Sequence, residues 1–118
     1  MFTLQIKDYF AAAHKLVGYD GPCSNLHGHT WHVHAKWQFE SLSDQGMATD
    51  FKQLKLSLHS VLDTLDHTYL NDLIENQPTA ERIAQVIYTM LKKDHYGISL
   101  KSVTVFESPE ASATYCCN

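Results

Sequence analysis

The sequence predicts an α+β protein in which an antiparallel sheet carries two helices on one face. Toward both ends of the chain, apolar and polar residues alternate, as they do in strands that bury one face. Between these segments, apolar residues recur every three or four positions, as in amphipathic helices. The connections between the outer segments suit hairpins, and hairpins favour antiparallel pairing.

Two strands are predicted in the first third of the chain. The first has apolar residues on even-numbered positions, on a face that His14 continues: Phe2, Leu4, Ile6, Phe10 and Ala12. The second spans about 27–39, with an apolar face formed by Trp31, Val33, Ala35, Trp37 and Phe39. His32 and His34 fall on its opposite face, so we interpret them as packing or polar surface residues. The connection between the strands (VGYDGPCSN) is rich in turn-forming residues and carries Cys23.

Two helices and a second hairpin complete the predicted order ββααββ. Asp50 is a suitable N-cap for a helix with the apolar stripe Phe51, Leu54, Leu58, Val61, Leu62 and Leu65. The segment LDHTYLNDLIENQ then interrupts the period. Thr79 is expected to cap a second helix that ends near Gly97, with the stripe Ile83, Val86, Ile87, Met90 and Leu91. The segments SVTVFE, SPEA and SATYCC predict a strand, a turn and a short returning strand.

Length and composition indicate one domain spanning residues 1–118 and exclude several classes of function. The chain has 9 basic and 13 acidic residues and no basic stripe, so nucleic acid is not an expected partner. A few lysines in one pocket can still attract a small anion. No apolar run suits a membrane span, and the N-terminal segment lacks a signal-peptide pattern, so we expect a cytoplasmic protein. An odd count of 3 cysteines does not predict a disulfide framework.

Histidines are concentrated in the segment CSNLHGHTWHVH, residues 23–34. His27 and His29 leave the same face of a strand, as two ligands of one metal ion would. His14 supplies a third imidazole if the first two strands pair antiparallel. Three neutral imidazoles with an open fourth position are typical of a catalytic zinc site. An isolated His-x-His is also a frequent chance pattern on surface strands, so spacing alone leaves both interpretations open.

Three further positions are candidates for proton transfer. Cys23 lies four residues before His27, and a thiol near a metal ion or an imidazolium becomes a thiolate. Its alternative role is that of a small buried apolar residue, and we assign that role to Cys116 and Cys117. In the pair Asp66–His67, the carboxylate can orient the ring, although adjacent side chains usually point apart.

Glu107 is predicted to end a buried strand on the same face as Val103 and Val105. A carboxylate in that position needs a partner, and a ligand with paired N–H donors would provide one. A solvent-exposed strand end is an equally good interpretation of the spacing. His59 and His95 are assigned no functional role.

Six motifs together resemble the 6-pyruvoyl-tetrahydropterin synthase family across nearly the whole chain. They are FAAAH at 10–14, CSNLHGH at 23–29, GMATDF at 46–51, LDHTYLN at 65–71, PTAE at 78–81 and VFES at 105–108. Three residues separate the cysteine from HGH. This spacing is similar to that of the bacterial 6-carboxy-tetrahydropterin synthases of queuosine biosynthesis, whereas the animal pyruvoyl synthases usually carry a longer insert.

The resemblance implies a role for each candidate residue. It implies zinc ligands at His14, His27 and His29, a proton-transfer thiol at Cys23 with partners Asp66 and His67, and a pterin anchor at Glu107. It also implies the tunnelling fold, in which sheets of several subunits join into a barrel. The expected assembly is a homohexamer, a dimer of trimers, with active sites between subunits. The C-terminal ATYCC departs from the charged ending common in relatives.

The implied reaction converts 7,8-dihydroneopterin triphosphate into 6-carboxy-tetrahydropterin, acetaldehyde and triphosphate. One alternative is 6-pyruvoyl-tetrahydropterin synthase. A second is a metal-binding protein without catalysis, which would not need Cys23 or Glu107. A zinc hydrolase would need a carboxylate base beside the metal, and the sequence places none near HGH.

Overall fold

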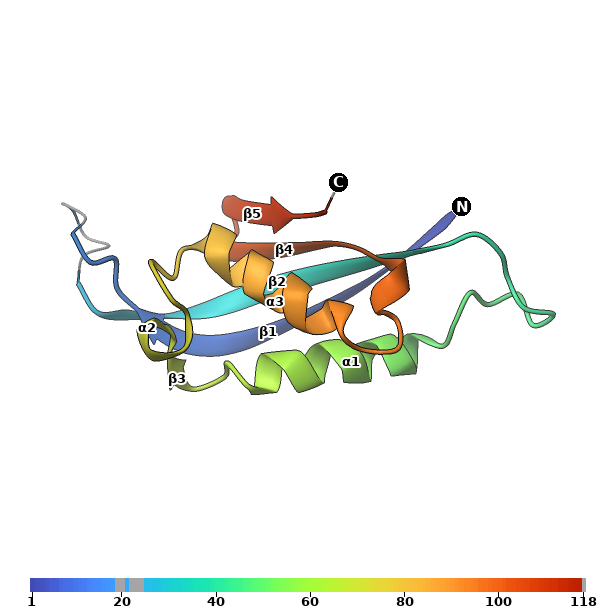
Figure 1. Cartoon of the computed structure of the whole chain (residues 1–118), viewed down its shortest axis with the longest axis horizontal. Coiled ribbons are helices and arrows are strands. Elements are labelled where there is room, and N and C mark those ends of the chain that lie inside the picture. Colours follow the sequence, from blue (N-terminus) through green and yellow to red (C-terminus); the bar gives the residue numbers. More distant parts are fainter. Residues whose placement is uncertain (19–20, 22–24, 118) are drawn as a thin grey trace.

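A computed structural model describes residues 1–18, 21 and 25–117 of the chain. Its elements, in chain order, are β1 (Phe2–His14), β2 (His27–Phe39), α1 (Phe51–Asp63), β3 (Thr68–Tyr69), α2 (Leu70–Leu73), α3 (Ala80–Lys92), the 3-10 helix η2 (Gly97–Ser99), β4 (Leu100–Ser108) and β5 (Ala111–Tyr115). The sheet has the order β3-β1-β2-β4-β5, and α1 and α3 cover one of its faces (Figure 1). The predicted α+β class, with helices on one face of the sheet, is confirmed.

The long hairpin of β1 and β2 gives the molecule its shape. The two strands pair antiparallel over their whole length, from Phe2 opposite Phe39 to His14 opposite His27. Thirteen residues of strand span about 43 Å, which accounts for most of the 55 Å long axis. β4 and β5 continue the antiparallel sheet, while the two residues of β3 pair parallel with β1.

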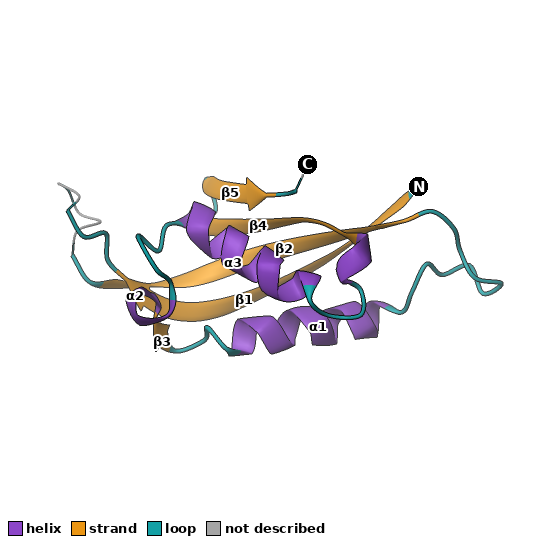
Figure 2. Cartoon of the chain, in the orientation of Figure 1, coloured by secondary structure: helices purple, strands orange, loops and turns teal. Residues whose placement is uncertain are grey.

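The core lies between the sheet and the two long helices, which Figure 2 shows along the same side of the strands. α1 packs against β1, and α3 packs against β4 and β5. The odd-numbered face of β2 supplies Trp31 and Trp37, both fully buried, so the predicted alternation is correct. Such rings each remove about 150–250 Å² from water and dominate the energetics of a core.

Both predicted helix starts are confirmed. The Asp50 carboxylate accepts a hydrogen bond from the Lys52 N–H at 2.9 Å, and the Thr79 hydroxyl accepts one from the Arg82 N–H at 3.2 Å. These contacts satisfy N–H groups that have no partner within the helix.

The predicted end of the second helix near Gly97 is wrong, because α3 ends at Lys92. The Asp94 carboxylate accepts a hydrogen bond from the Tyr96 N–H at 2.7 Å and turns the chain. Gly97 then passes so close to the helix end that a Cβ atom there would lie 1.9 Å from the Lys92 carbonyl oxygen. Glycine is therefore required at the start of η2.

Two segments differ from prediction at the ends of the sheet. The segment LDHTYLN forms β3 and α2, where no element was predicted. β5 ends at Tyr115, so Cys116 and Cys117 lie beyond the edge strand and are exposed. The prediction that they are small buried residues is wrong. Among the described residues, none of the helices is both long and apolar enough to span a bilayer.

Candidate metal centre

Three histidines converge at the end of the β1–β2 hairpin, on the face that the helices cover. The antiparallel register places His14 opposite His27, and His29 follows on the same face of β2. The ring centroids of His27 and His29 are 4.6 Å apart, and those of His14 and His29 are 5.2 Å apart. The antiparallel pairing of β1 with β2, which the prediction of His14 as the third imidazole required, is thus present.

Backbone carbonyls fix the tautomers of two of these rings. His14 Nδ1 lies 2.8 Å from the Pro78 oxygen, and His27 Nδ1 lies 2.6 Å from the Asn25 oxygen. A carbonyl only accepts hydrogen bonds, so each Nδ1 must donate, and a neutral ring then carries a lone pair on Nε2. The two Nε2 atoms face one another at 3.0 Å. Two lone pairs at that distance need a shared proton or a cation between them.

The third imidazole, that of His29, also has a ring nitrogen without a hydrogen-bond partner among the described residues. His29 Nε2 is buried and makes no hydrogen bond within the described residues. Glu107 Oε1 lies 3.5 Å away, without hydrogen-bond geometry. Burial lowers the pKa of both His14 and His29, and the neighbouring His27 lowers both further. The rings of His14 and His29 therefore stay neutral to lower pH than a free imidazole does, and the neutral form is the one that ligates metals.

The donor atoms fit a divalent metal ion. One ligand atom each from His14, His27, His29 and Glu107 lies within 4.8 Å of the others. Ligands about 2.0–2.1 Å from a tetrahedral zinc ion are about 3.3 Å from each other. The 3.0 Å and 3.5 Å separations lie on either side of this value. The chain therefore has a three-histidine and glutamate group that could hold a metal ion.

Glu107 lies where β4 brings its carboxylate against His29. It shares a face with Val103 and Val105, as predicted, but its proximity to the histidines was not predicted. Its side chain is 35% exposed. It also borders a hollow of about 350 Å³ between the start of α3 and β5. The carboxylate can therefore meet either a metal ion or a small molecule in that hollow.

Asp66 and His67 form a hydrogen-bonded pair at the outer edge of β1. The Asp66 carboxylate accepts the Ala11 N–H at 2.9 Å and contacts His67 Nδ1 at 2.8 Å. These two hydrogen bonds, in that order, lower the pKa of Asp66. His67 has a positive φ of 57°, which turns its ring back onto the preceding residue. The general expectation that adjacent side chains point apart fails here for that reason.

The structure does not bring this pair to the metal centre of the same chain. Asp66 docks on Ala11, about 10 Å along β1 from His14, and the His67 side chain is 83% exposed. Cys23, the predicted proton-transfer thiol, lies outside the described residues. The structure thus assembles four of the seven predicted site residues, His14, His27, His29 and Glu107, in one cluster.

Asn71, in α2, holds the chain where it leaves β1 and was missed by sequence reasoning. Its amide accepts the Lys15 N–H at 3.0 Å and donates to the Lys15 carbonyl at 2.9 Å. A similar pair of hydrogen bonds joins the Gln77 amide to the backbone of Val17. The contacts of Asn71 position Lys15, the residue after His14. In the sequence, the only indication of this role was the presence of an amide side chain within LDHTYLN.

Asn71→Ala is expected to lower the free energy of unfolding by about 1–3 kcal/mol, because it leaves two partly buried backbone groups unpaired. Denaturant unfolding at matched protein concentration measures the change. Gln38→Ala is the matched control, because that exposed amide makes only a 3.5 Å contact with Thr3. Equal stability of the two variants would contradict the assigned role of Asn71.

The fold and the site define a class of protein: a small α+β protein with a three-histidine group that could hold a metal ion at the end of a long hairpin. A family model described as 6-pyruvoyl tetrahydropterin synthase matches residues 3–117. The chain belongs to this family, as the six motifs predicted.

Relatives within the family carry two names. The chain is 30% identical to 6-carboxy-5,6,7,8-tetrahydropterin synthase of Haemophilus influenzae, over 98% of this chain and 99% of the relative. It is 37% identical to the protein of the same name from Synechocystis sp., over 90% and 86%. The solved structure of Caenorhabditis elegans 6-pyruvoyl tetrahydropterin synthase superposes with a TM-score of 0.90 at 30% identity, over 99% of this chain and 96% of that one.

Proposed function

We propose that this protein is a zinc-dependent 6-carboxy-5,6,7,8-tetrahydropterin synthase. Its reaction would convert 7,8-dihydroneopterin triphosphate and one water molecule into 6-carboxy-tetrahydropterin, acetaldehyde and triphosphate. Family membership and the names of several relatives confirm the predicted class of function, an enzyme that acts as a pterin lyase. The observation that carries the proposal is the cluster of three imidazoles and Glu107 in a chain of this family.

His14, His27 and His29 would hold the metal through their Nε2 atoms. Carbonyls of Pro78 and Asn25 hold the opposite ring nitrogens, which keeps two of the rings in the ligating tautomer. When bound, a divalent ion there supplies Lewis-acid chemistry, acidifying protons next to the substrate oxygens that it polarises. Three imidazoles and a carboxylate suit zinc, among other divalent ions.

Cys23 and the pair Asp66–His67 would move protons. We assign the proton removed from the substrate side chain to Cys23 Sγ, and its further transfer to the His67 ring. Asp66 holds that ring through Nδ1 at 2.8 Å, which orients it.

An oligomer explains how His67 reaches an active site. β3 covers β1 only at Ala12 and Ala13, and β5 forms the opposite edge of the sheet, so both edges have strand backbone to pair. We propose that sheets of neighbouring subunits join at these edges, as a barrel within a hexamer. The exposed His67 at the β1 edge would then serve the metal centre of an adjacent subunit.

Glu107 would anchor the pterin. A dihydropterin presents an N–H and an amino group side by side on its pyrimidine edge, and one carboxylate can accept both. The hollow of about 350 Å³ beside Glu107 offers space for such a ring. The Glu107 carboxylate would thus select the pterin ring and direct the side chain of the substrate toward the three histidines.

Glu107→Gln is expected to weaken binding of 7,8-dihydroneopterin by about 1–3 kcal/mol, because the amide places a donor against one of the ligand's donors. Calorimetric titration measures the affinity, with metal content checked in each sample. Glu110→Gln, in the exposed turn before β5, is the matched control. Unchanged affinity together with a lower melting temperature would make Glu107 a residue of the fold.

Incubation with 7,8-dihydroneopterin triphosphate tests the proposed function. The metal-loaded protein is expected to release triphosphate, and loss of bound metal should stop the release. A metal-binding protein without catalysis would release none. The place in queuosine biosynthesis, the cytoplasmic location and the single domain of residues 1–118 stay predictions.

A further inference from the structure

The indole ring of Trp31 packs against two of the three clustered histidines. Its centroid lies 4.9 Å from that of His14, with the ring planes at 84°, and 5.0 Å from that of His29, with the planes at 64°. Both contacts are edge-to-face, an arrangement that aromatic pairs prefer at separations of about 4.5–7 Å. Trp31 is fully buried, so it meets the two imidazoles from the protein interior.

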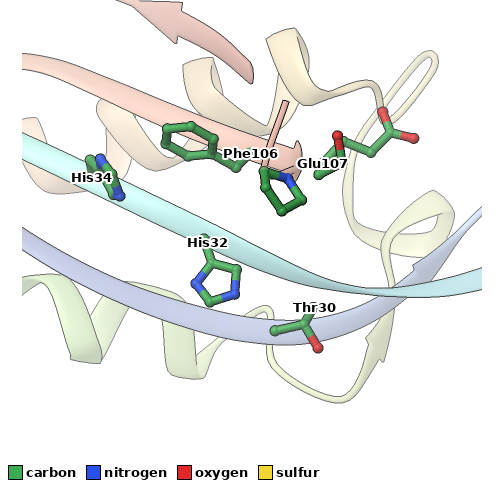
Figure 3. Close-up of a pocket in the computed structure, with 7 residues that line it drawn as sticks. Thr30, His32, His34, Phe106 and Glu107 are labelled. Atoms are coloured by element: carbon green, nitrogen blue, oxygen red, sulfur yellow. The ribbon is translucent and has the colours of Figure 1, made fainter. Parts of the chain in front are cut away.

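The direction of Trp31 follows from the alternation of side chains along β2. Figure 3 shows its neighbours Thr30 and His32 around a hollow on the sheet face that the helices leave open. Successive side chains of a strand point to opposite faces, so Trp31 points to the helix-covered face, as His29 does. Trp31 is therefore the next residue of β2, after His29, on the face that carries the proposed metal ligands.

The Trp31 indole is also attached to the neighbouring strand β1. Its Nε1–H donates a hydrogen bond to the Ala12 carbonyl oxygen at 3.3 Å, and Ala12 lies opposite His29 in the register. The Phe10 ring stacks on the indole, with the centroids 6.3 Å apart and the planes at 17°. An indole fixed to both strands can hold the rings of His14 and His29 at a constant separation.

The orientation of His29 depends most on this packing. The Nδ1 atoms of His14 and His27 each contact a backbone carbonyl, whereas no hydrogen bond within the described residues holds the His29 ring. The rings that contact His29 are those of His14, His27 and Trp31. Trp31 is the one of these three that is not a proposed ligand, so its position does not depend on whether a metal ion is bound.

We infer that Trp31 is a positioning residue for the metal ligands, which orients the rings of His14 and His29 before a metal ion binds. The inference rests on the proposed metal centre. A ring that is already oriented loses less conformational freedom on binding, and this raises affinity. Phenylalanine at this position would keep an aromatic core but would remove the hydrogen bond to Ala12 and leave space beside both imidazoles.

Trp31→Phe is expected to lower the affinity for zinc about 10-fold or more, as loss of a residue that orients metal ligands typically does. Trp37→Phe is the matched control, because Trp37 is also fully buried on the same face of β2, but about 20 Å farther along the strand. Its affinity should equal that of wild type. Zinc competition with a chromophoric chelator measures the affinity of the full chain, and denaturant unfolding of the metal-free proteins measures their stability.

Fluorescence provides a second measurement, which does not depend on the folding of Trp31→Phe. The chain has 2 tryptophans, so the indole emission of Trp37→Phe comes from Trp31 alone. Zinc should change this emission, because the indole contacts two ligand rings, and the change should saturate at one ion per chain. The emission of Trp31→Phe, which comes from Trp37, should not respond to zinc.

Equal zinc affinity in wild type, Trp31→Phe and Trp37→Phe would overturn the inference. An equal loss of affinity in both variants would also overturn it, because that result indicates a general effect of the core. Emission of Trp37→Phe that stays constant while zinc binds would contradict the contact with the ligands. A wild-type chain that binds no zinc would refute the proposed metal centre itself and the inference with it, whereas zinc bound equally well by wild type and Trp31→Phe refutes the positioning role alone.

Discussion

Replacing His27 with alanine is expected to remove most of the bound metal from a protein that stays folded. Two remaining imidazoles cannot hold a divalent ion as three can. Loss of a residue that hydrogen-bonds to a metal ligand typically lowers metal affinity about 10–100-fold. Loss of the ligand itself should therefore lower the affinity about 100-fold or more. Elemental analysis of purified protein, followed by a competition titration with a chromophoric chelator, measures the change.

His32→Ala is the matched control for this experiment. It removes the same side chain from the same strand, but on the face opposite the metal group. Its metal content should equal that of wild type. Unchanged metal content in a folded His27→Ala variant would refute the three-histidine centre.

Cys23→Ala is expected to lower turnover by about 10²–10⁴-fold while leaving the fold and the metal content unchanged. This is the range over which a positioned acid or base typically accelerates a reaction. Steady-state release of triphosphate, measured beside the zinc content of the same sample, gives both quantities.

Cys116→Ala provides the comparison, because that thiol is exposed beyond β5 and has no proposed role. It should turn over like wild type. Loss of metal from Cys23→Ala would instead make the thiol a ligand, and turnover near that of wild type would remove it from the mechanism.

The three-histidine cluster that could hold a metal ion was largely predictable, because its geometry follows from strand parity. His27 and His29 share a face for the same reason that Trp31 and Trp37 do, and an antiparallel hairpin brings His14 beside them. Periodicity is a local property of the chain, so the two long strands and the helix starts were predicted correctly. The opposite orientation of His32 and His34 follows from the same alternation.

The remaining features depend on contacts between distant parts of the chain. β3 forms because Thr68 and Tyr69 pair with two residues of β1, Ala12 and Ala13. A segment of two residues is too short to show the alternation of apolar and polar residues that predicts a strand. The proximity of Glu107 to His29 depends on how β4 registers against β2. The contact of Asp66 with Ala11 spans 55 positions, and a positive φ at His67 sets the geometry of the pair. Neither is visible in the spacing of LDHTYLN.

The stoichiometry of the products distinguishes the carboxy synthase activity from the pyruvoyl synthase activity. Relatives of this chain carry the names of both the carboxy and the pyruvoyl synthases, and the two proposed activities differ in whether the substrate side chain is cleaved. Metal-loaded protein is incubated with 7,8-dihydroneopterin triphosphate, and acetaldehyde and triphosphate are quantified in the same reaction. We expect equal amounts of acetaldehyde and triphosphate, together with 6-carboxy-tetrahydropterin. Triphosphate released without acetaldehyde would contradict it and indicate the pyruvoyl activity.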